Sequence, residues 1–229
     1  MGESLPQKSS ARHFGLVLGL DTCTRWLNLA LLGDDGELLA QAHEEVQTHT
    51  TRLVPALEAL FLEAGRAPRE LVAIGVVLGP GSFTGLRVGL AAAEGLSAAL
   101  GVPAFGIDSL AALAMRSDGQ GEGVALLDAR RRQVYARRFR REGVLVTALA
   151  EPAALDPAEA VHFERSAWAI GDGVPLVSSW PPRCVLQPEV PNLALSAAWH
   201  AKEHAESGVP GTALAPLYVR APDAKLPGN

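Results

Sequence analysis

The stretch that decides the fold is Gly79-Pro80-Gly81-Ser82-Phe83-Thr84-Gly85. An apolar run, 71–78, precedes it, and residues 86–100 carry leucine and alanine at helical spacing. This order predicts a strand, a glycine-rich loop and a helix. Free backbone N–H groups at the start of a helix can hold an anion or the acceptor groups of a partner. The sequence therefore predicts a binding loop.

The loop does not match the nucleotide-binding or hydrolase motifs. A dinucleotide fingerprint has the order G-x-G-x-x-G, but the third glycine here, Gly85, comes one residue late, and the Gly-Lys-Ser/Thr end of a P-loop is absent. The nucleophile elbow needs glycine two residues to each side of the serine. Around Ser82 those places hold Pro80 and Thr84. We therefore expect a partner-binding loop and no nucleophile.

The predicted helix carries two stripes of residues. One is apolar and predicts a core face, and the other consists of the small residues Gly85, Gly89, Ala92 and Ala99. Glycine weakens a helix interior by about 1 kcal/mol relative to alanine, so its presence needs a reason. Either the small stripe packs tightly on the protein's own sheet, or it receives the backbone of another protein. Under the second hypothesis, Gly89→Leu weakens association while the chain stays folded.

Composition predicts a globular protein without a membrane anchor. The chain has 229 residues, 48% of them hydrophobic, which is enough for two compact lobes, and its net charge of -5 argues against a protein that coats nucleic acid by itself. Two cysteines are too few for a disulfide or zinc framework. Residues 1–13 predict a flexible tail, and no apolar run reaches the roughly 20 residues of a membrane span. We expect a soluble, cytoplasmic protein.

The two halves of the chain repeat one pattern. A strand that ends at Asp21 is followed by a second strand and a turn at Gly36, and a strand that ends at Asp128 is followed by a second strand and a turn at Gly143. The interval from aspartate to glycine is fifteen residues in both halves. Such a repeat predicts an α/β chain of two duplicated lobes, each a mixed sheet with helices, and a cleft between them.

We place the lobe boundary in a polar, glycine-rich stretch. The N-terminal lobe is predicted to span residues 14–116 and the C-terminal lobe residues 117–229. The last predicted helix, 193–206, is the element able to pack back on the first lobe. Its core positions are expected to include Ala198 and Trp199.

Two aspartates end equivalent strands at the predicted cleft. Paired carboxylates there can bind Mg²⁺ on a nucleotide, and the residues expected to face it are Asp21, Thr22, Asp128 and Arg130. No glycine follows Asp21 to admit a phosphate, which disfavours this hypothesis.

A dense basic run lies in the second lobe. It comprises Arg130, Arg131, Arg132, Arg137, Arg138, Arg140 and Arg141 around two aromatic residues. Arginines beside aromatic rings can bind phosphates and stack on bases, but most basic runs of this kind are solvated sheet faces. Direct RNA contact and a solvated face both stay open.

The histidines give no metal site. His200 and His204 are four residues apart, a spacing at which one helix face can hold a metal. The glutamate of H-E-x-x-H and a third ligand are missing from this sequence. We therefore expect a solvated helix face.

Five segments together resemble the bacterial TsaB family, also called YeaZ. They are residues 15–22, the loop 79–85 with Leu86-Arg87-Val88-Gly89, residues 106–110, Asp128-Ala129-Arg130 with Val134-Tyr135, and residues 216–220. The resemblance runs from about Gly15 to the C-terminus, and its most specific part is G-P-G-S-F-T-G-x-R. It implies a two-lobed fold of the actin and heat-shock-chaperone ATPase (ASKHA) type, in agreement with the repeat.

The resemblance also implies a role. TsaB works with its paralogue TsaD and the small ATPase TsaE to transfer a threonylcarbamoyl group to N6 of the adenosine at position 37 of tRNAs that read ANN codons. TsaD carries the active site and the metal, and TsaB is a non-catalytic scaffold. The resemblance implies a heterodimer with TsaD, a homodimer when alone and only indirect contact with tRNA. No cofactor is expected for the isolated chain, whereas ATP or ADP is expected at the assembled complex.

The loop and the helix start are the expected partner-binding site. Its residues are Gly81, Ser82, Phe83, Thr84, Gly85, Arg87, Gly89 and Ala92. TsaD has an H-x-x-x-H pair where this chain has Ser109 and Leu113. Leucine has no donor atom and a lone serine hydroxyl is a poor metal ligand, so no metal is expected. A stand-alone nucleotide-dependent phosphotransferase is the main alternative, and a metallopeptidase is disfavoured.

Overall fold

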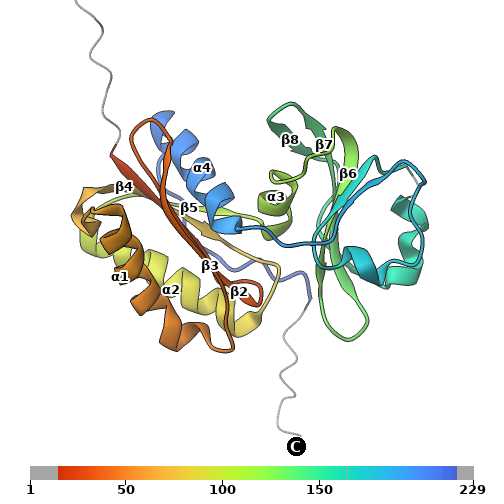
Figure 1. The fold of residues 1–229 in the computed structure, drawn as a ribbon, viewed down its shortest axis with the longest axis horizontal. Coiled ribbons are helices and arrows are strands. Elements are labelled where there is room, and N and C mark those ends of the chain that lie inside the picture. Colours follow the sequence, from red (N-terminus) through yellow and green to blue (C-terminus); the bar gives the residue numbers. More distant parts are fainter. Residues whose placement is uncertain (1–14, 164, 221–229) are drawn as a thin grey trace, which may run out of the picture.

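The computed structural model describes residues 15–163 and 165–220, whose strands form two sheets (Figure 1). The first sheet has the order β3-β2-β1-β4-β5, with β1 Leu16–Asp21, β2 Trp26–Leu32, β3 Leu38–Glu45, β4 Leu71–Val77 and β5 Ala104–Ile107. The second has the order β11-β10-β6-β7-β8, with β6 Gly121–Asp128, β7 Val134–Glu142, β8 Leu145–Ala148, β10 Trp168–Ile170 and β11 Val185–Gln187. A short strand, β9 (Ala153–Leu155), also pairs with β7.

The predicted duplication is confirmed by the strand pairing. In the first sheet β1 runs antiparallel to β2 and parallel to β4, and in the second β6 runs antiparallel to β7 and parallel to β10. The turns at Gly36 and Gly143 have φ of 84° and 63°, where glycine avoids the steric penalty of a side chain. Both sheets therefore repeat one topology.

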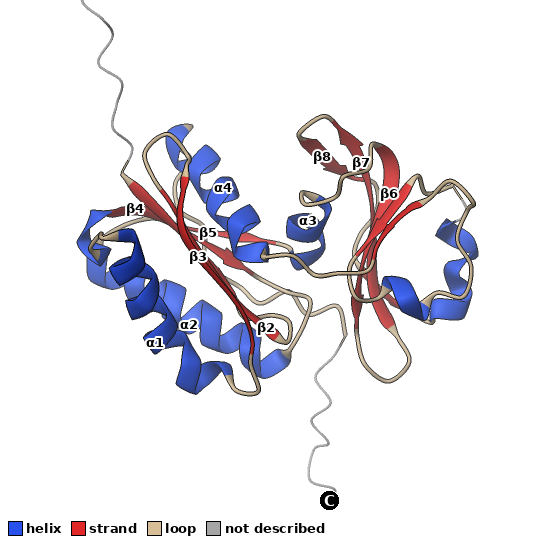
Figure 2. Cartoon of the chain, in the orientation of Figure 1, coloured by secondary structure: helices blue, strands red, loops and turns tan. Residues whose placement is uncertain are grey.

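Helices cover both faces of the first sheet (Figure 2). Helices α1 (His49–Ala64) and α2 (Phe83–Leu100) lie on one face, and α4 (Leu193–Glu206) lies on the other. The short helix α3 (Ser109–Ala114) lies between α4 and the second sheet, and the 3-10 turns are η1 (Pro68–Glu70), η2 (Pro157–Phe163) and η3 (Val174–Leu176). The tail predicted for residues 1–13 lies outside the described residues.

Helix α4 lies directly against the first sheet because two glycines make room for it. Gly19 of β1 and Gly75 of β4 are register partners. A Cβ atom on Gly19 would lie 1.9 Å from the carbonyl oxygen of Ala194, and one on Gly75 would lie 1.9 Å from that of Ala197. Side chains at these two positions would therefore push the helix off the sheet.

The N-cap of α4 anchors the helix on the strands below. The buried Asn192 side chain accepts a hydrogen bond from the Ala194 amide and donates to the carbonyl oxygens of Leu29 and Ala42, each at 3.0 Å. The buried face is built from leucine and alanine, as expected for Ala198, but Trp199 is 42% exposed. The predicted burial of Trp199 is wrong because the alanine face of α4, and not its tryptophan, packs on the glycines of the sheet.

Helix α2 begins three residues before the predicted start. The Ser82 hydroxyl accepts from the Gly85 amide and caps the helix, so Phe83 and Thr84 belong to its first turn. The helix ends at Gly101, whose φ of 68° is left-handed. The loop and the helix are thus one continuous unit at the carboxyl end of β4.

Of the three hydrophobic clusters in the described residues, the largest extends through both lobes. It joins buried residues of the first sheet, such as Ile74, to Leu127 and Phe139 of the second. An ion pair also joins the lobes, because Arg137 of β7 pairs with Asp108 at the N-cap of α3. The lobes are therefore fixed together through α3. No helix among the described residues is long and apolar enough to cross a membrane.

Candidate functional site

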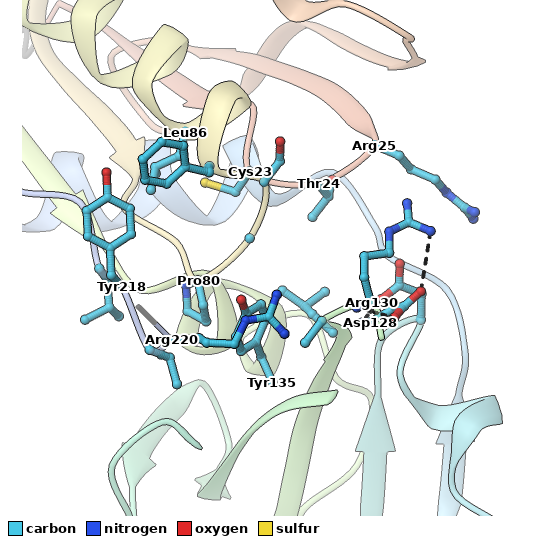
Figure 3. Close-up of a pocket in the computed structure, with 18 of the residues that line it drawn as sticks. Cys23, Thr24, Arg25, Pro80, Leu86, Asp128, Arg130, Tyr135, Tyr218 and Arg220 are labelled. Atoms are coloured by element: carbon cyan, nitrogen blue, oxygen red, sulfur yellow. Dashed lines mark hydrogen bonds and ion pairs between the residues drawn. The ribbon is translucent and has the colours of Figure 1, made fainter. Parts of the chain in front are cut away.

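A cleft of about 680 Å³ lies between the two lobes (Figure 3). Its first-lobe wall is the turn 23–25 after β1 and the loop 80–83 at the start of α2. Its second-lobe wall is the strand end and turn 127–130 with Asp172, and the C-terminal segment 217–220 closes one side. The turn after β1 and the end of β6 therefore face each other across this cleft.

Asp21 and Thr22 are buried beneath the cleft and do not line it. The two carboxylate oxygens of Asp21 accept hydrogen bonds from the Cys23 amide at 2.8 Å and the Asn28 side chain at 2.6 Å. The Thr22 hydroxyl donates to the Gly85 carbonyl at 2.7 Å. This geometry corrects the prediction that these two residues face a nucleotide, because their polar atoms are used to join β1, β2 and α2.

We expect Asp21 to shape the dependence of stability on pH. Burial raises the pKa of its carboxyl above the ordinary 3.8, so the folded chain binds this proton more tightly than the unfolded chain. The resulting stabilisation is fully present below pH 3.8 and is lost as the pH rises through the raised value. Asp21→Asn cannot ionise, so its unfolding midpoint in urea should vary less than that of the parent across this range. The exposed site Asp35→Asn is the control, and equal slopes in parent and Asp21→Asn would contradict the expectation.

Asp128, which the repeat placed at the cleft, lies in the cleft wall together with Arg130. Asp128 Oδ1 accepts from the Arg130 amide at 2.7 Å, and Asp128 Oδ2 lies 3.6 Å from the Arg130 guanidinium. That they face a nucleotide stays a prediction. Sequence reasoning missed Asp172, which accepts from the Asp128 amide at 2.8 Å and whose pKa is raised by burial. The available signal was Gly171-Asp172-Gly173 directly after a strand.

The turn after β6 has an unusual backbone. Arg130, Arg131 and Arg132 have φ of 61°, 54° and 62°, a left-handed conformation that is uncommon for residues other than glycine. The Gln133 amide donates to the Arg130 carbonyl at 3.0 Å, and the Gln133 side chain accepts from Arg220. These bonds hold the tight turn that brings Arg130 into the cleft wall.

The arginines of the basic run on β7 form ion pairs and hydrogen bonds with other residues of the same chain. Arg138 and Arg140 both pair with Glu122, and the nearby Arg140 guanidinium lowers the pKa of Glu122. Arg141 donates to the carbonyl oxygens at the end of α3, and Arg137 pairs with Asp108. Of the two explanations for the run, the structure favours a sheet face with internal pairing at these four positions.

The glycine stripe of α2 packs on the protein's own sheet. A Cβ atom on Gly85 would lie 2.1 Å from the Thr22 carbonyl oxygen, and one on Gly89 would lie 2.4 Å from the Thr22 hydroxyl. Gly81 is similarly close to Cys23, and Ala92 is half-buried. This corrects the prediction that Gly85 and Gly89 receive a partner. Among the other predicted partner-binding residues, Ser82, Phe83, Thr84 and Arg87 are exposed.

Because Gly89 faces Thr22 and not solvent, Gly89→Leu is expected to lower the stability of the isolated chain. The new side chain would displace buried Thr22 and break its hydrogen bond to Gly85, at a combined cost of about 3 kcal/mol of stability. Chemical denaturation of the purified variant measures this loss. A midpoint equal to that of the parent would contradict the assignment of this stripe to the core.

A different face of α2 is open to solvent. Its exposed residues are Thr84, Arg87, Ala91, Glu94, Gly95, Ala98 and Ala99, and a Cβ atom on Gly95 would find nothing within 4 Å. On α1, which lies in the same layer as α2, Val54 is 60% and Leu62 is 82% exposed. Sequence reasoning missed this surface, although Ala91, Gly95 and Ala98 have the spacing of one helix face.

The residues at the positions of the TsaD histidines belong to the core. Ser109 is buried and its hydroxyl donates to the Pro80 carbonyl at 2.7 Å, and Leu113 is buried beside it in α3. The buried Cys23 thiol donates to the Val77 carbonyl, and burial raises its pKa well above the ordinary value. No group of three or more metal-ligating side chains occurs within residues 15–163 and 165–220.

Comparison with known proteins matches the chain to proteins of tRNA modification. A family model described as "TsaD: tRNA N6-adenosine threonylcarbamoyltransferase" matches residues 42–174. An uncharacterized protein of Mycobacterium leprae is 34% identical over 92% of this chain, which spans 56% of that protein's length. The "tRNA threonylcarbamoyladenosine biosynthesis protein TsaB" of Escherichia coli K12 is 30% identical over 72% of this chain and 71% of that protein.

Solved structures agree with the sequence matches. YeaZ from Pseudomonas aeruginosa superimposes with a TM-score of 0.74 at 30% identity, covering 89% of this chain and 99% of that one. The activator of 2-hydroxyisocaproyl-CoA dehydratase from Clostridium difficile, at 11% identity and a TM-score of 0.52 over 84% of this chain and 96% of that one, shares the fold. The predicted two-lobed ASKHA-type fold is confirmed. The match to most of the E. coli TsaB and nearly all of YeaZ shows that the chain belongs to the TsaB (YeaZ) family.

Proposed function

We propose that this chain is the non-catalytic subunit of tRNA threonylcarbamoyladenosine biosynthesis and acts by binding its catalytic paralogue TsaD. The family membership and the match of the TsaD family model to residues 42–174 support the pathway. A paralogue that shares the fold presents helices equivalent to α1 and α2. Two such surfaces can pack together without any new element.

The exposed face of α2 is the observation that carries the proposed docking. Gly95 costs a helix interior about 1 kcal/mol relative to alanine, yet no atom lies within 4 Å of a Cβ atom built on it. Ala91 and Ala98 flank it, and the exposed Val54 and Leu62 of α1 lie on the same outer layer. Small residues let a second helix approach closely, and covering large apolar side chains of the same helix layer is favourable in free energy.

The burial of Asp21, Ser109 and Leu113 supports the non-catalytic role. A phosphotransferase of this fold would need Asp21 to reach a metal-bound nucleotide, but this carboxylate accepts two hydrogen bonds under the cleft floor. The positions of the TsaD histidines hold Ser109 and Leu113 in the core. We therefore assign the transfer chemistry to TsaD.

The proposed assembly has further members. TsaE is expected to join the pair of TsaB and TsaD, and tRNA is expected to contact the pair mainly through TsaD. When TsaD is absent, a second copy of this chain is expected to cover the same face of α2. ATP or ADP is expected at the assembled complex, where Asp128 and Arg130 line the cleft. The expected compartment is the cytoplasm.

The proposal is tested by co-expression and complementation. This chain and the TsaD of the same organism are expected to elute together from a size-exclusion column. Together with that TsaD, the chain is also expected to restore threonylcarbamoyladenosine, measured by mass spectrometry of digested tRNA, in bacteria depleted of their own TsaB. Separate elution and no restored nucleoside would overturn it. Turnover of ATP onto a small acceptor by the purified chain alone would favour the phosphotransferase.

A further inference from the structure

An exposed cation is fixed in place at the start of α2. The Arg87 guanidinium carbon lies 3.7 Å from the centre of the Phe83 ring, in stacking distance. Arg87 Nε donates a hydrogen bond to the Tyr218 hydroxyl at 3.3 Å. The two aromatic rings are 5.3 Å apart. We call Phe83, Arg87 and Tyr218 the arginine platform.

The C-terminal segment holds one wall of the platform. The Leu217 amide donates to the Leu78 carbonyl at 2.7 Å, which brings Tyr218 beside the start of α2, at the edge of the cleft (Figure 3). Two residues 131 positions apart in the chain, Arg87 and Tyr218, thus combine to orient one guanidinium. Because these contacts already order the Arg87 side chain in the free protein, binding a ligand to it costs less conformational entropy.

The outer edge of Arg87 is left for a ligand. Within the described part of the chain, its two terminal nitrogens have no hydrogen-bond acceptor. The first turn of α2 contains no acidic residue, so the positive end of the helix dipole is not compensated there. Phe83 is 37% and Tyr218 is 40% exposed, and exposed aromatic residues around an arginine are typical of binding hot spots. The planar fork of the guanidinium matches an anion with two oxygens.

We propose that the arginine platform binds a carboxylate side chain of the partner protein that docks on α2. This inference rests on the proposed function and names the chemistry of its contact. Arg87 lies on the same exposed face as Ala91 and Gly95, one and two turns along the helix. A partner helix on that face brings an aspartate or glutamate to the platform. Continuity with this face favours a protein carboxylate over an RNA phosphate.

Titration calorimetry of TsaD from the same organism into the full chain tests the proposal at several salt concentrations. Arg87→Gln is expected to weaken binding about tenfold at low salt and to flatten its salt dependence, because a charge-assisted hydrogen bond is lost. Arg87→Lys should weaken binding less and keep the salt dependence, and Tyr218→Phe, which loses only the acceptor, should weaken it about twofold to threefold. Arg69→Gln is the matched control, an exposed arginine near the opposite end of β4.

The outcomes separate this inference from the proposed function. If the parent chain does not bind TsaD, both are overturned. If the parent binds and Arg87→Gln binds equally, with the same salt dependence, the docking survives and the platform does not act as proposed. If Arg87→Gln leaves TsaD binding intact but weakens tRNA binding by the assembled pair, the ligand is an RNA phosphate and the proposal is wrong. Melting temperatures equal to that of the parent exclude misfolding as the cause.

Discussion

A chain that carries Gly75→Val is expected to accumulate almost entirely as insoluble or unfolded protein. The valine Cβ would lie 1.9 Å from the Ala197 carbonyl oxygen, which is a backbone atom and cannot rotate away. Helix α4 would have to leave the sheet and expose its buried alanines and Leu193. Overpacking typically costs 1–3 kcal/mol, and adding the loss of this contact we expect about 4 kcal/mol or more, a large part of a stability of about 5–15 kcal/mol.

The measurement is soluble yield together with urea unfolding followed by circular dichroism. Gly95→Ala is the control, because it replaces a glycine in an open helix position and should raise stability by as much as about 1 kcal/mol. A Gly75→Val chain with the yield and midpoint of the parent would show that α4 does not rest on this glycine.

Gly95→Leu should weaken the assembly with TsaD strongly while leaving the chain folded. The leucine points into open space in the isolated protein, so its melting temperature should equal or exceed that of the parent. In the complex it would stand where two helices approach closely. A loss of about 2 kcal/mol corresponds to a roughly thirtyfold weaker complex.

Co-elution with TsaD and the dissociation constant measure this effect. Gly95→Ala adds a single methyl group and should weaken binding far less, which gives a graded series at one position. Gly89→Leu is the contrasting variant, because it should lower the stability of the isolated chain by disturbing the core. If Gly95→Leu binds TsaD as tightly as the parent does, the exposed face of α2 is not the docking surface.

The fold was predictable because its signals are local and repeated. Apolar runs that end at Asp21 and Asp128, with glycine turns at equal intervals, are enough to place β1, β2, β6 and β7. Short strands were missed. Strand β11 has three residues, Val185–Gln187, and only the parallel pairing with β10 makes it a strand. Such pairing is tertiary and leaves no period in the sequence.

The site was only partly predictable, because the composition of a helix does not determine which of its faces packs on the sheet. The stripe of Gly85 and Gly89 and the stripe of Ala91 and Gly95 both consist of small residues on α2. The first meets Thr22 at the end of β1 and the second meets solvent, and this difference depends on how the helix rotates on the sheet. Likewise, Asp21 ends a strand at the predicted cleft, yet its side chain points into the core.

The packing of α4 on the first sheet also bears on how the protein is made. The ribosome completes the strands of residues 16–107 long before it releases Leu193–Glu206, the helix that covers one face of their sheet. Until then Gly19 of β1, Gly75 of β4 and the apolar side chains around them stay uncovered on the nascent polypeptide. Contacts between residues so far apart in the sequence form slowly, and an exposed apolar sheet invites aggregation. We therefore expect a chain truncated before Leu193 to expose this face of the sheet permanently and to accumulate as aggregated protein.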